Sequence, residues 1–502
     1  MGEMIKKESK RNMKIAVVGA GVSGAGVVRA LLTHSNFTSA DQIDVFEPRD
    51  TLGPGLPYNP HEDEAVRLNL APEMLSVVKE NPNDFVEWLE ENMDEPTNFE
   101  NLVSRPTYGR YLMERFMPYF EDERVTHIQN MVIDLEVIEQ ETGLLYRLKT
   151  DKGWSDTIYD AVFFSIGHPP YNDFYNLAGV ENYIHNPYPM YEKLSPIDPT
   201  KKIGVVGSGA TAMDIMRYLH LNFDLKHPLT YYDPNQPFNF VNIPCKEEVP
   251  FTFSKEWIEE EKDKYNGFIP IERLIEVFKQ DMAKGGLDDP KAIYEKYKEN
   301  TFELKREAFE TNDQELALMQ AYSSELVAFL PNLFNALSGK DKSYYLKNYH
   351  SKLLFIKSRV PNLTYKWLFE LYDAGKLRVV GGLKDITLTD EGHFIVDANE
   401  KEEQDFLINA TGFNMTIETV AERSKLIKNL FDKEIILPHR NGNFILVDWP
   451  ETRVMNQRYG LMENLFFLGL LIGGTQHENN DASLTIDQGA YSATAFMDSL
   501  DS

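Results

Sequence analysis

Three glycines near the amino terminus have the spacing of a phosphate-binding turn. Gly19, Gly21 and Gly24 lie in the run Gly-Ala-Gly-Val-Ser-Gly, between the apolar run Ile-Ala-Val-Val and a segment with helical apolar spacing. In such a strand–turn–helix unit the first glycine permits the tight turn, the second lets the backbone approach a pyrophosphate, and the third lets helix pack on strand. The helix start then directs free N–H groups at the phosphates. The alternative is a glycine-rich turn with a structural role only.

An acidic residue completes this pattern. A second apolar strand over residues 43–46 ends at Glu47. This position lies about 20 residues beyond the last glycine, where a dinucleotide-binding fold places the acceptor of a ribose hydroxyl. Strand, turn, helix and acidic residue in this order are typical of a dinucleotide-binding domain.

The same pattern returns in the middle of the chain. Residues 201–206 predict a strand, Gly207-Ser208-Gly209-Ala210-Thr211-Ala212 a turn, and residues 213–219 an amphipathic helix. The alanine at the third glycine position is a permitted variant. A following strand ends at Asp233, which could accept a ribose hydroxyl, and no arginine lies next to it to hold a 2′-phosphate. This slightly favours NADH over NADPH, and both stay open; a structural repeat without a bound nucleotide is the alternative.

The remaining segments alternate between strand and helix patterns around these two turns. A turn-rich loop, 52–58, is followed by the segment 67–74, at the sheet edge where ligands bind in doubly wound folds. Apolar spacing near 3.6 predicts helices over 84–91 and 108–119 and throughout 255–376, which we interpret as a helical insertion. Further predicted strands are 125–137, 144–148, 159–166, 377–380, 384–389, 393–397 and 407–409. The tail predicts a strand over 465–470, a glycine loop over 473–479 and a helix over 484–500.

Composition and charge narrow the class of protein. The chain has 502 residues with a net charge of −28, which disfavours nucleic acid and anionic lipid as partners. Its one cysteine, Cys245, excludes disulfides, CxxC redox pairs and cysteine zinc sites within one chain, and we expect no metal site. The amino terminus lacks the apolar core of a secretory signal, and no apolar run reaches the length of a membrane span. We therefore expect a cytoplasmic protein acting on a small molecule.

Several motifs together resemble a known family. These are PGLPY followed by RLNLAPEM, then RPTYGRYL, GKLRVVGG and GGTQHEN, beside the two glycine turns. The chain resembles bacterial FAD–NAD(P)-binding flavoproteins with two dinucleotide-binding domains, which are related to class B flavin monooxygenases and include N-hydroxylating enzymes. Two departures are Ser165-Ile166-Gly167, where relatives read Ala-Thr-Gly, and His477, where relatives often have a bulky aromatic residue.

The resemblance implies an α/β fold with two doubly wound, Rossmann-like domains and a helical insertion. Residues 1–195 and 401–502 are the expected two parts of an FAD-binding domain. Residues 196–400 are the expected NAD(P)-binding domain, with the insertion at about 255–376.

The resemblance also assigns cofactor-binding residues. The first turn holds the FAD pyrophosphate, Glu47 the adenosine ribose, and the second turn NAD(P)H. Met131 and Val132 offer backbone to the adenine. Asn69 and Met74 lie near the flavin, Gly469 and the Thr475 loop close over it, and Thr411 and Gly412 support the crossing between domains. The full predicted set is Gly19, Gly21, Val22, Ser23, Gly24, Glu47, Pro48, Asn69, Met74, Met131, Val132, Gly167, Gly207, Ser208, Gly209, Ala210, Thr211, Thr411, Gly412, Gly469, Thr475 and His477.

Three functions are compatible with these residues. NAD(P)H would reduce the flavin, and the reduced flavin could react with oxygen to oxygenate a nucleophilic substrate. Alternatives are a flavin reductase or dehydrogenase with another acceptor, and a non-enzymatic nucleotide sensor. The chemistry requires no protein acid or base, so the catalytic residues stay unassigned; His477 is a candidate donor beside the flavin or a structural histidine.

Overall fold

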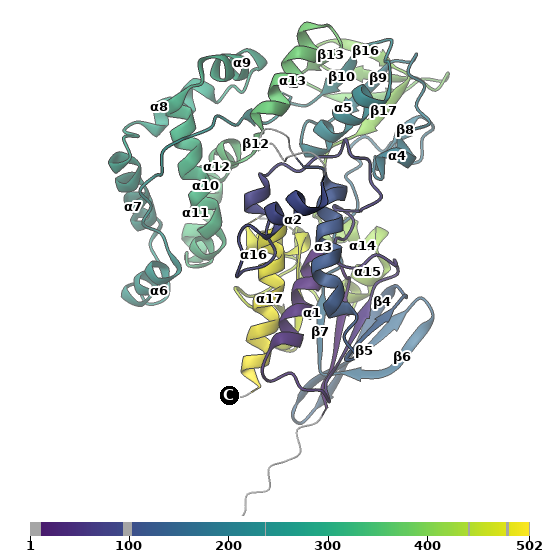
Figure 1. Ribbon diagram of the computed structural model, residues 1–502, viewed down its shortest axis with the longest axis vertical. Helices are drawn as coiled ribbons and strands as arrows, with labels where there is room; N and C mark the ends of the chain where they lie inside the picture. Colours follow the sequence, from purple (N-terminus) through teal and green to yellow (C-terminus); the bar gives the residue numbers. More distant parts are fainter. Residues whose placement is uncertain (1–11, 94–102, 236, 440–441, 478–480, 501–502) are drawn as a thin grey trace, which may run out of the picture.

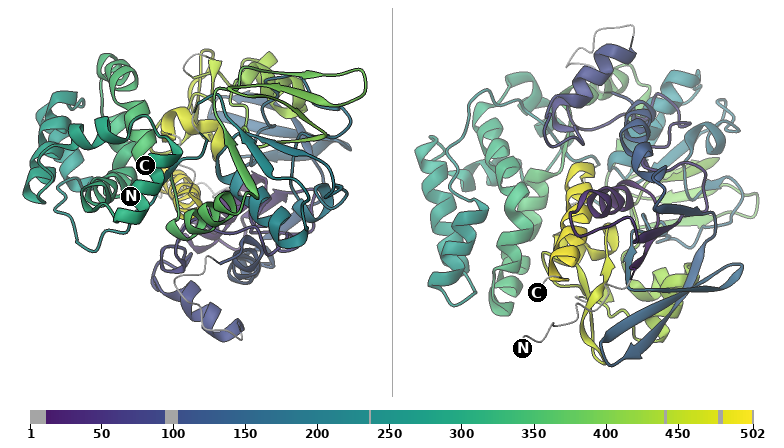
Figure 2. Two further views of the ribbon diagram at one scale, coloured as in Figure 1. Left: turned by 90° about the horizontal axis from the view of Figure 1, so that it is seen from above. Right: turned by 60° about the horizontal axis from the view of Figure 1, so that its bottom comes forward.

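A computed structural model describes residues 12–93, 103–235, 237–439, 442–477 and 481–500. Two mainly parallel sheets form two stacked domains, and a group of helices stands beside them (Figure 1). Figure 2 shows in two further directions that these helices lie to one side of both domains. The predicted fold class, two doubly wound domains with a helical insertion, is confirmed.

The first sheet combines strands from both ends of the chain. β1 lies in its centre between β2 and β7, so the sheet is wound in both directions from the strand that leads into the first glycine turn. β19 pairs in parallel with β7, which closes the sheet with residues from the tail. In spatial order the strands are β18 (Arg453–Asn456), β19 (Gly460–Phe467), β7 (Ala161–Phe164), β1 (Lys14–Val18), β2 (Gln42–Phe46) and β3 (Val125–Ile128).

Helices from both ends of the chain also meet on this sheet. α1 (Val22–Thr33) packs along α17 (Ala482–Ser499), and Figure 1 shows the two side by side. A methyl group on Gly26 would overlap the Ile486 carbonyl oxygen, and one on Gly489 would lie 2.5 Å from the Ser23 carbonyl oxygen. The two backbones are therefore in direct contact. The other elements of this domain are η1 (Pro72–Met74), α2 (Asp84–Asn92), α3 (Arg105–Phe120), α14 (Ile417–Arg423), α15 (Lys425–Asp432) and the antiparallel strands β4 (Val132–Gln140), β5 (Gly143–Thr150) and β6 (Gly153–Tyr159).

The second sheet repeats the arrangement with five strands. Their order is β13 (Leu377–Val380), β10 (Leu229–Tyr232), β9 (Ile203–Val206), β17 (Phe406–Asn409) and β8 (Tyr183–Ile184). β8 and β17 lie outside the expected range 196–400, so we propose domain boundaries at the two crossings described below. Also in this domain are α4 (Met190–Lys193), α5 (Ala210–Asn222) and the antiparallel strands β14 (Asp385–Leu388), β15 (Phe394–Asp397) and β16 (Lys401–Gln404).

The insertion begins after β10 and ends before β13. It contains β11 (Phe240–Val241), which pairs with β12 (Arg359–Val360), and helices that bury apolar side chains against one another and against the second sheet. The helices are α6 (Lys255–Lys264), α7 (Ile271–Lys284), α8 (Pro290–Tyr297), α9 (Phe302–Thr311), α10 (Gln314–Asn335), α11 (Gly339–Asn348), α12 (His350–Lys357) and α13 (Asn362–Asp373).

Two chain segments cross between the domains, and they are bonded to each other. Tyr171 pairs with Phe413 in an antiparallel bridge, and the Asn172 N–H donates to the Gly412 carbonyl at 2.9 Å. Asn409 Nδ2 donates to the Asn172 carbonyl at 2.9 Å, and the His168 ring stacks on Phe413 at 4.5 Å. The two hydrogen-bonded segments thus form a paired strap between the domains.

The tail differs from its prediction in one detail. β19 ends at Phe467, and Leu470–Ile472 (η3) and Gly473–Gln476 (α16) form short helical turns where the sequence predicted strand and loop. Gly473 and Gly474 allow this turn to pack on Phe444 and His439, which a methyl group at either position would overlap or crowd. The rest of the predicted loop, 478–479, lies outside the described residues.

Candidate nucleotide-binding cleft

The first glycine turn has the geometry of a phosphate cradle. Gly19 has φ +99°, and its N–H donates to the Phe46 carbonyl at 2.8 Å. A methyl group on Gly19 would overlap the Ser165 carbonyl, and one on Gly24 would overlap the Gly19 carbonyl. α1 begins after Gly21, and no side chain of the described residues caps its start. The first N–H groups of this helix therefore stay available to an anion.

The loop after Glu47 lies directly on this turn. The Gly53 N–H donates to the Ala20 carbonyl at 2.7 Å. A methyl group on Gly21 would come within 3.3 Å of the Gly55 Cα, so Gly21 and Gly55 permit a close backbone contact. The glycine spacing predicts a role for Gly21 toward a pyrophosphate but does not predict this contact with Gly55.

Glu47 is held at the turn as a carboxylate. It is 4% exposed, and its Oε2 accepts from the Ala20 N–H at 3.2 Å. Arg49 donates to both carboxylate oxygens, at 2.8 and 3.0 Å. Burial acts to raise the pKa of Glu47, but the hydrogen bonds and charge of Arg49 outweigh it, and the pKa is lowered. The acceptor predicted for the adenosine ribose is thus ionised and oriented.

Two apolar side chains on neighbouring loops are exposed. Leu56, next to Gly55, and Met74, at the end of η1, are each 63% exposed. The Met74 carbonyl accepts from Ser483 Oγ near the start of α17 at 3.4 Å. Large exposed apolar side chains on loops beside the cradle suit contact with a flat ring system.

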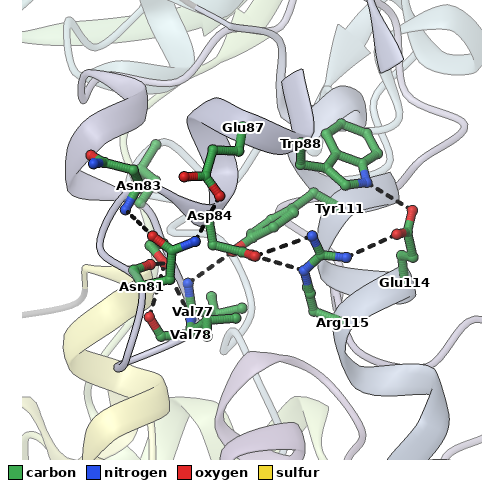
Figure 3. Close-up of polar contacts among 12 residues, drawn as sticks. Val77, Val78, Asn81, Asn83, Asp84, Glu87, Trp88, Tyr111, Glu114 and Arg115 are labelled. Atoms are coloured by element: carbon green, nitrogen blue, oxygen red, sulfur yellow. Dashed lines mark hydrogen bonds and ion pairs between the residues drawn. The ribbon is translucent and has the colours of Figure 1, made fainter. Parts of the chain in front are cut away.

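A polar network fixes the segment that follows Met74 and begins at Val77 (Figure 3). The Val77 N–H donates to Tyr111 Oη at 3.0 Å, and Tyr111 donates to Asp84 Oδ2 at 2.7 Å. Arg115 donates from Nε to the same oxygen at 2.8 Å. Burial acts to raise the pKa of Asp84, but Arg115 and Tyr111 outweigh it, so the pKa is lowered and the carboxylate stays charged. α2 and α3 are thereby locked to the loop that precedes them.

The tail loop joins the first domain to the insertion. Asn335 Nδ2, at the end of α10, donates to the Thr475 carbonyl at 2.8 Å. The His477 ring is 4% exposed and packs on Phe334, Tyr345 and His350, with centroids 5.0, 5.3 and 5.2 Å away. These contacts favour the structural alternative for His477, and its role beside a flavin remains a prediction.

The second turn is more open than the first. Gly207 has φ +103°, and a methyl group there would overlap the Ala410 carbonyl. A methyl group on Gly209 would meet no atom within 4 Å, and within the described residues no side chain caps the start of α5. Ser208 Oγ donates to Asp233 Oδ2 at 2.6 Å. Gly167 and Gly412, at the crossings, likewise face open space.

A buried ion-pair network connects the two domains. Asp214 of α5 is 1% exposed, and its Oδ2 accepts from Arg105 of α3 at 2.8 Å and from Tyr188 Oη at 2.6 Å. Arg217 lies 3.5 Å from the other Asp214 oxygen and also donates to Thr364 of α13. One carboxylate thus links the first domain, the second domain and the insertion.

His168 lies near Arg105 at this junction. Its side chain is exposed to solvent on one side and stacks on Phe413 on the other. The surrounding protein lowers the pKa of His168 to about 4, and the Arg105 charge adds to the effect. His168 is therefore a neutral aromatic surface at neutral pH.

The predicted site residues fall into three groups by exposure. Ser23, Gly24, Glu47, Val132, Gly207, Thr475 and His477 are buried. Gly19, Gly21, Val22, Ser208, Gly209, Thr211, Thr411, Gly412 and Gly469 are half-buried, and Pro48, Asn69, Met74, Met131, Gly167 and Ala210 are exposed. The Met131 N–H donates to Asp151 Oδ1 at 3.1 Å, and its carbonyl accepts from the Asp151 N–H at 2.9 Å. Its backbone is thus already bonded within the protein.

These features fit two nucleotide cofactors. Each turn begins with a glycine at positive φ whose methyl group would overlap a carbonyl oxygen. Each also has an uncapped helix start and an acidic residue directly after the next strand. A methyl group on Gly469 would have only Ser23 Oγ near it, at 4.0 Å, so space remains between Gly469 and the start of α1. The described residues contain no cluster of acidic, histidine or cysteine side chains suited to a metal ion. Within the same ranges, no helix combines the length and apolarity that crossing a membrane requires.

Three residues of this region were not predicted from the sequence. Gly55 and Arg105 lie in the motifs PGLPY and RPTYGRYL, but their partners are far away in sequence. Asp214 is an acidic residue within the apolar helix segment Ala-Met-Asp-Ile-Met. A charged residue at such a position could have indicated a buried ion pair.

Comparisons with known proteins agree with this geometry. Residues 16–169 match a family model described as FAD-NAD(P)-binding. No curated protein matches the chain significantly.

Solved structures share the fold over nearly the whole chain. The FAD-bound cadaverine monooxygenase of desferrioxamine biosynthesis from Erwinia amylovora is 12% identical, with a TM-score of 0.58 over 97% of this chain and 94% of that chain. The ornithine N-hydroxylase of Kutzneria sp. 744, solved with reduced FAD, NADP+ and L-ornithine, is 15% identical, with a TM-score of 0.57 over 98% and 99%. The L-lysine 6-monooxygenase of Pseudomonas syringae is 12% identical, with a TM-score of 0.58 over 97% and 98%. The chain therefore has the fold of two-domain flavoproteins related to class B flavin monooxygenases.

Proposed function

We propose that this protein is an FAD-dependent, NAD(P)H-using oxidoreductase, a flavin monooxygenase that oxygenates a small nucleophilic substrate. The observation that carries the proposal is the pair of uncapped glycine turns, each at the carboxyl edge of a parallel sheet and joined by one strap. The match over residues 16–169 supports the FAD site. The structural neighbours act on amines, which supports an amine as the substrate class.

FAD, when bound, supplies the redox chemistry: it accepts hydride from NAD(P)H and passes electrons to oxygen. The residues of this chain bind and orient it. The turn at Gly19–Gly24 would hold the pyrophosphate, and Glu47 the adenosine ribose. Asn69, Met74, Gly469 and Thr475 would surround the ring end.

The second turn and the crossings would place the nicotinamide. Gly207, Ser208, Gly209, Ala210 and Thr211 would hold the nucleotide phosphates at the start of α5. Thr411 and Gly412 would support the passage between domains, and both amide and hydroxyl of Thr411 are anchored on Asn409 at 3.1 and 2.8 Å. The insertion, docked on the Thr475 loop, would exclude water from the substrate side. The proposal includes the expectation that the protein acts on its small-molecule substrate in the cytoplasm.

Rapid mixing tests this proposal. The purified protein is expected to be yellow and to bleach anaerobically with NADH or NADPH. Mixing the reduced protein with oxygen and, in turn, lysine, ornithine or cadaverine should yield a hydroxylated amine for at least one of them, detected by mass spectrometry. Direct release of hydrogen peroxide with every amine would favour the reductase instead. A colourless protein that takes up no FAD would end both proposals and leave the nucleotide sensor.

A further inference from the structure

The second turn is faced by a fixed carboxylate. Asp233 follows β10 directly, and β10 lies beside β9, the strand that leads into Gly207. Ser208 Oγ donates to Asp233 Oδ2 at 2.6 Å, and the Asn235 N–H donates to Oδ1 at 2.9 Å. These two bonds orient the carboxylate on the turn and leave lone pairs on both oxygens.

The surroundings of Asp233 are acidic. The Tyr175 hydroxyl is affected by both Asp233 and Asp385: burial raises its pKa, and these two carboxylates raise it further. The Asp233 carbonyl accepts from the Leu383 N–H at 3.0 Å, so the chain that leads to Asp385 runs past this site. Asp233 is therefore the carboxylate that contacts the turn directly, and Asp385 lies further along the chain that passes it.

Lys305, which interacts electrostatically with Asp233, and Lys226, which precedes β10, offset the charge of Asp233 only weakly. Lys305 of α9 is fully buried, and its Nζ donates to the Pro237 carbonyl at 2.7 Å. Burial lowers the pKa of Lys305 to about 7, so its charge is partly lost at neutral pH. Lys226 precedes β10, at the opposite end of the strand, and is paired with Asp224.

We infer that Asp233 makes the second site selective for NADH over NADPH. Its free lone pairs can accept the adenosine ribose hydroxyls of NADH, whereas the 2′-phosphate of NADPH would stand against a carboxylate. The inference rests on the proposed function and deepens it by naming the reductant. It also separates this chain from the Kutzneria ornithine N-hydroxylase, whose structure contains NADP+.

The test is equilibrium binding of the unreactive nucleotides. NAD+ and NADP+ are titrated by calorimetry into the protein as purified, into Asp233→Ser and into Asp224→Ser. The last variant removes the same charge from a side chain that is 89% exposed at the other end of β10. Thermal unfolding of the three proteins verifies that each is folded.

The wild-type protein should bind NAD+ at least about 100-fold more tightly than NADP+, since like charges a few Å apart repel strongly near a protein surface. Asp233→Ser should weaken NAD+ at least about tenfold and reduce the preference to less than about tenfold, because it removes a charged acceptor. Asp224→Ser should keep the wild-type preference.

Equal or tighter binding of NADP+ by the wild-type protein would overturn the inference, as would a preference that survives in Asp233→Ser. Binding of neither nucleotide would overturn it as well. Because calorimetry requires no flavin, a colourless protein that still prefers NAD+ would refute the proposed oxidoreductase function and leave the assignment of Asp233 intact.

Discussion

Replacement of Asp214 by alanine tests whether the domains are held together by one buried carboxylate. The variant would leave Arg105, Arg217 and the Tyr188 hydroxyl without their shared acceptor. Arg105 and Arg217 have side chains that are only 16% and 7% exposed, and Asp214 is 1% exposed. Loss of one partner from a buried ion pair costs about 3–5 kcal/mol, because the remaining charge is not solvated.

For a domain of the size of the second one, this loss corresponds to a midpoint of thermal unfolding lower by about 10 °C. Circular dichroism on heating measures it. Asp224→Ala is the matched control, since Asp224 is 89% exposed, and it should change the stability by less than about 0.5 kcal/mol.

A double-mutant cycle isolates the pair itself. Arg105→Met with Asp214→Ala should be less destabilised than the sum of the single variants by about 1–3 kcal/mol, because the two side chains are in contact at 2.8 Å. Additive losses, or a single-variant loss below about 1 kcal/mol, would refute the assignment of this carboxylate as the joint between domains.

Three further variants probe the cradles and the insertion. Gly24→Ala should lower both flavin content and melting temperature because its methyl group overlaps the Gly19 carbonyl, whereas Gly339→Ala, in open space at the start of α11, should change neither. Gly209→Val should keep flavin content and fold, since its side chain meets no protein atom at Cβ, but weaken NAD+ at least about tenfold in calorimetry. The pKa of Lys305 is lowered from 10.5 in the unfolded chain to about 7 in the folded protein. Between these pH values the unfolded chain therefore binds more protons than the folded protein, and the free energy of unfolding rises with pH. In urea titrations Lys305→Met should remove this rise; an unchanged slope would contradict the buried amine.

Local signals predicted most of the fold. Each glycine turn, with its strand and helix, fits within about 30 residues, so spacing alone located Gly19–Gly24 and Gly207–Ala212. The helical insertion was likewise readable from apolar periodicity.

Contacts between distant segments were not predictable in this way. The approach of Gly21 to Gly55, the pairing of Arg105 with Asp214, and the burial of His477 under the insertion each depend on the final packing. The short helix that begins at Gly473 was not predicted, because glycine has a low helix propensity. Glycine spacing thus predicted where the two turns lie, whereas the residues that contact each turn became known only from the structure.

The pairing of α1 with α17 has a consequence for synthesis. The glycine turn is translated early, but the strand and the helix that complete its sheet and cover α1 emerge more than 400 residues later. During synthesis the turn at Gly19–Gly24 is therefore present before β19 and α17, the elements that complete its sheet and pack on α1. We therefore expect FAD to bind stably only after the tail has been translated, and a chain that stops before β19 to retain no FAD.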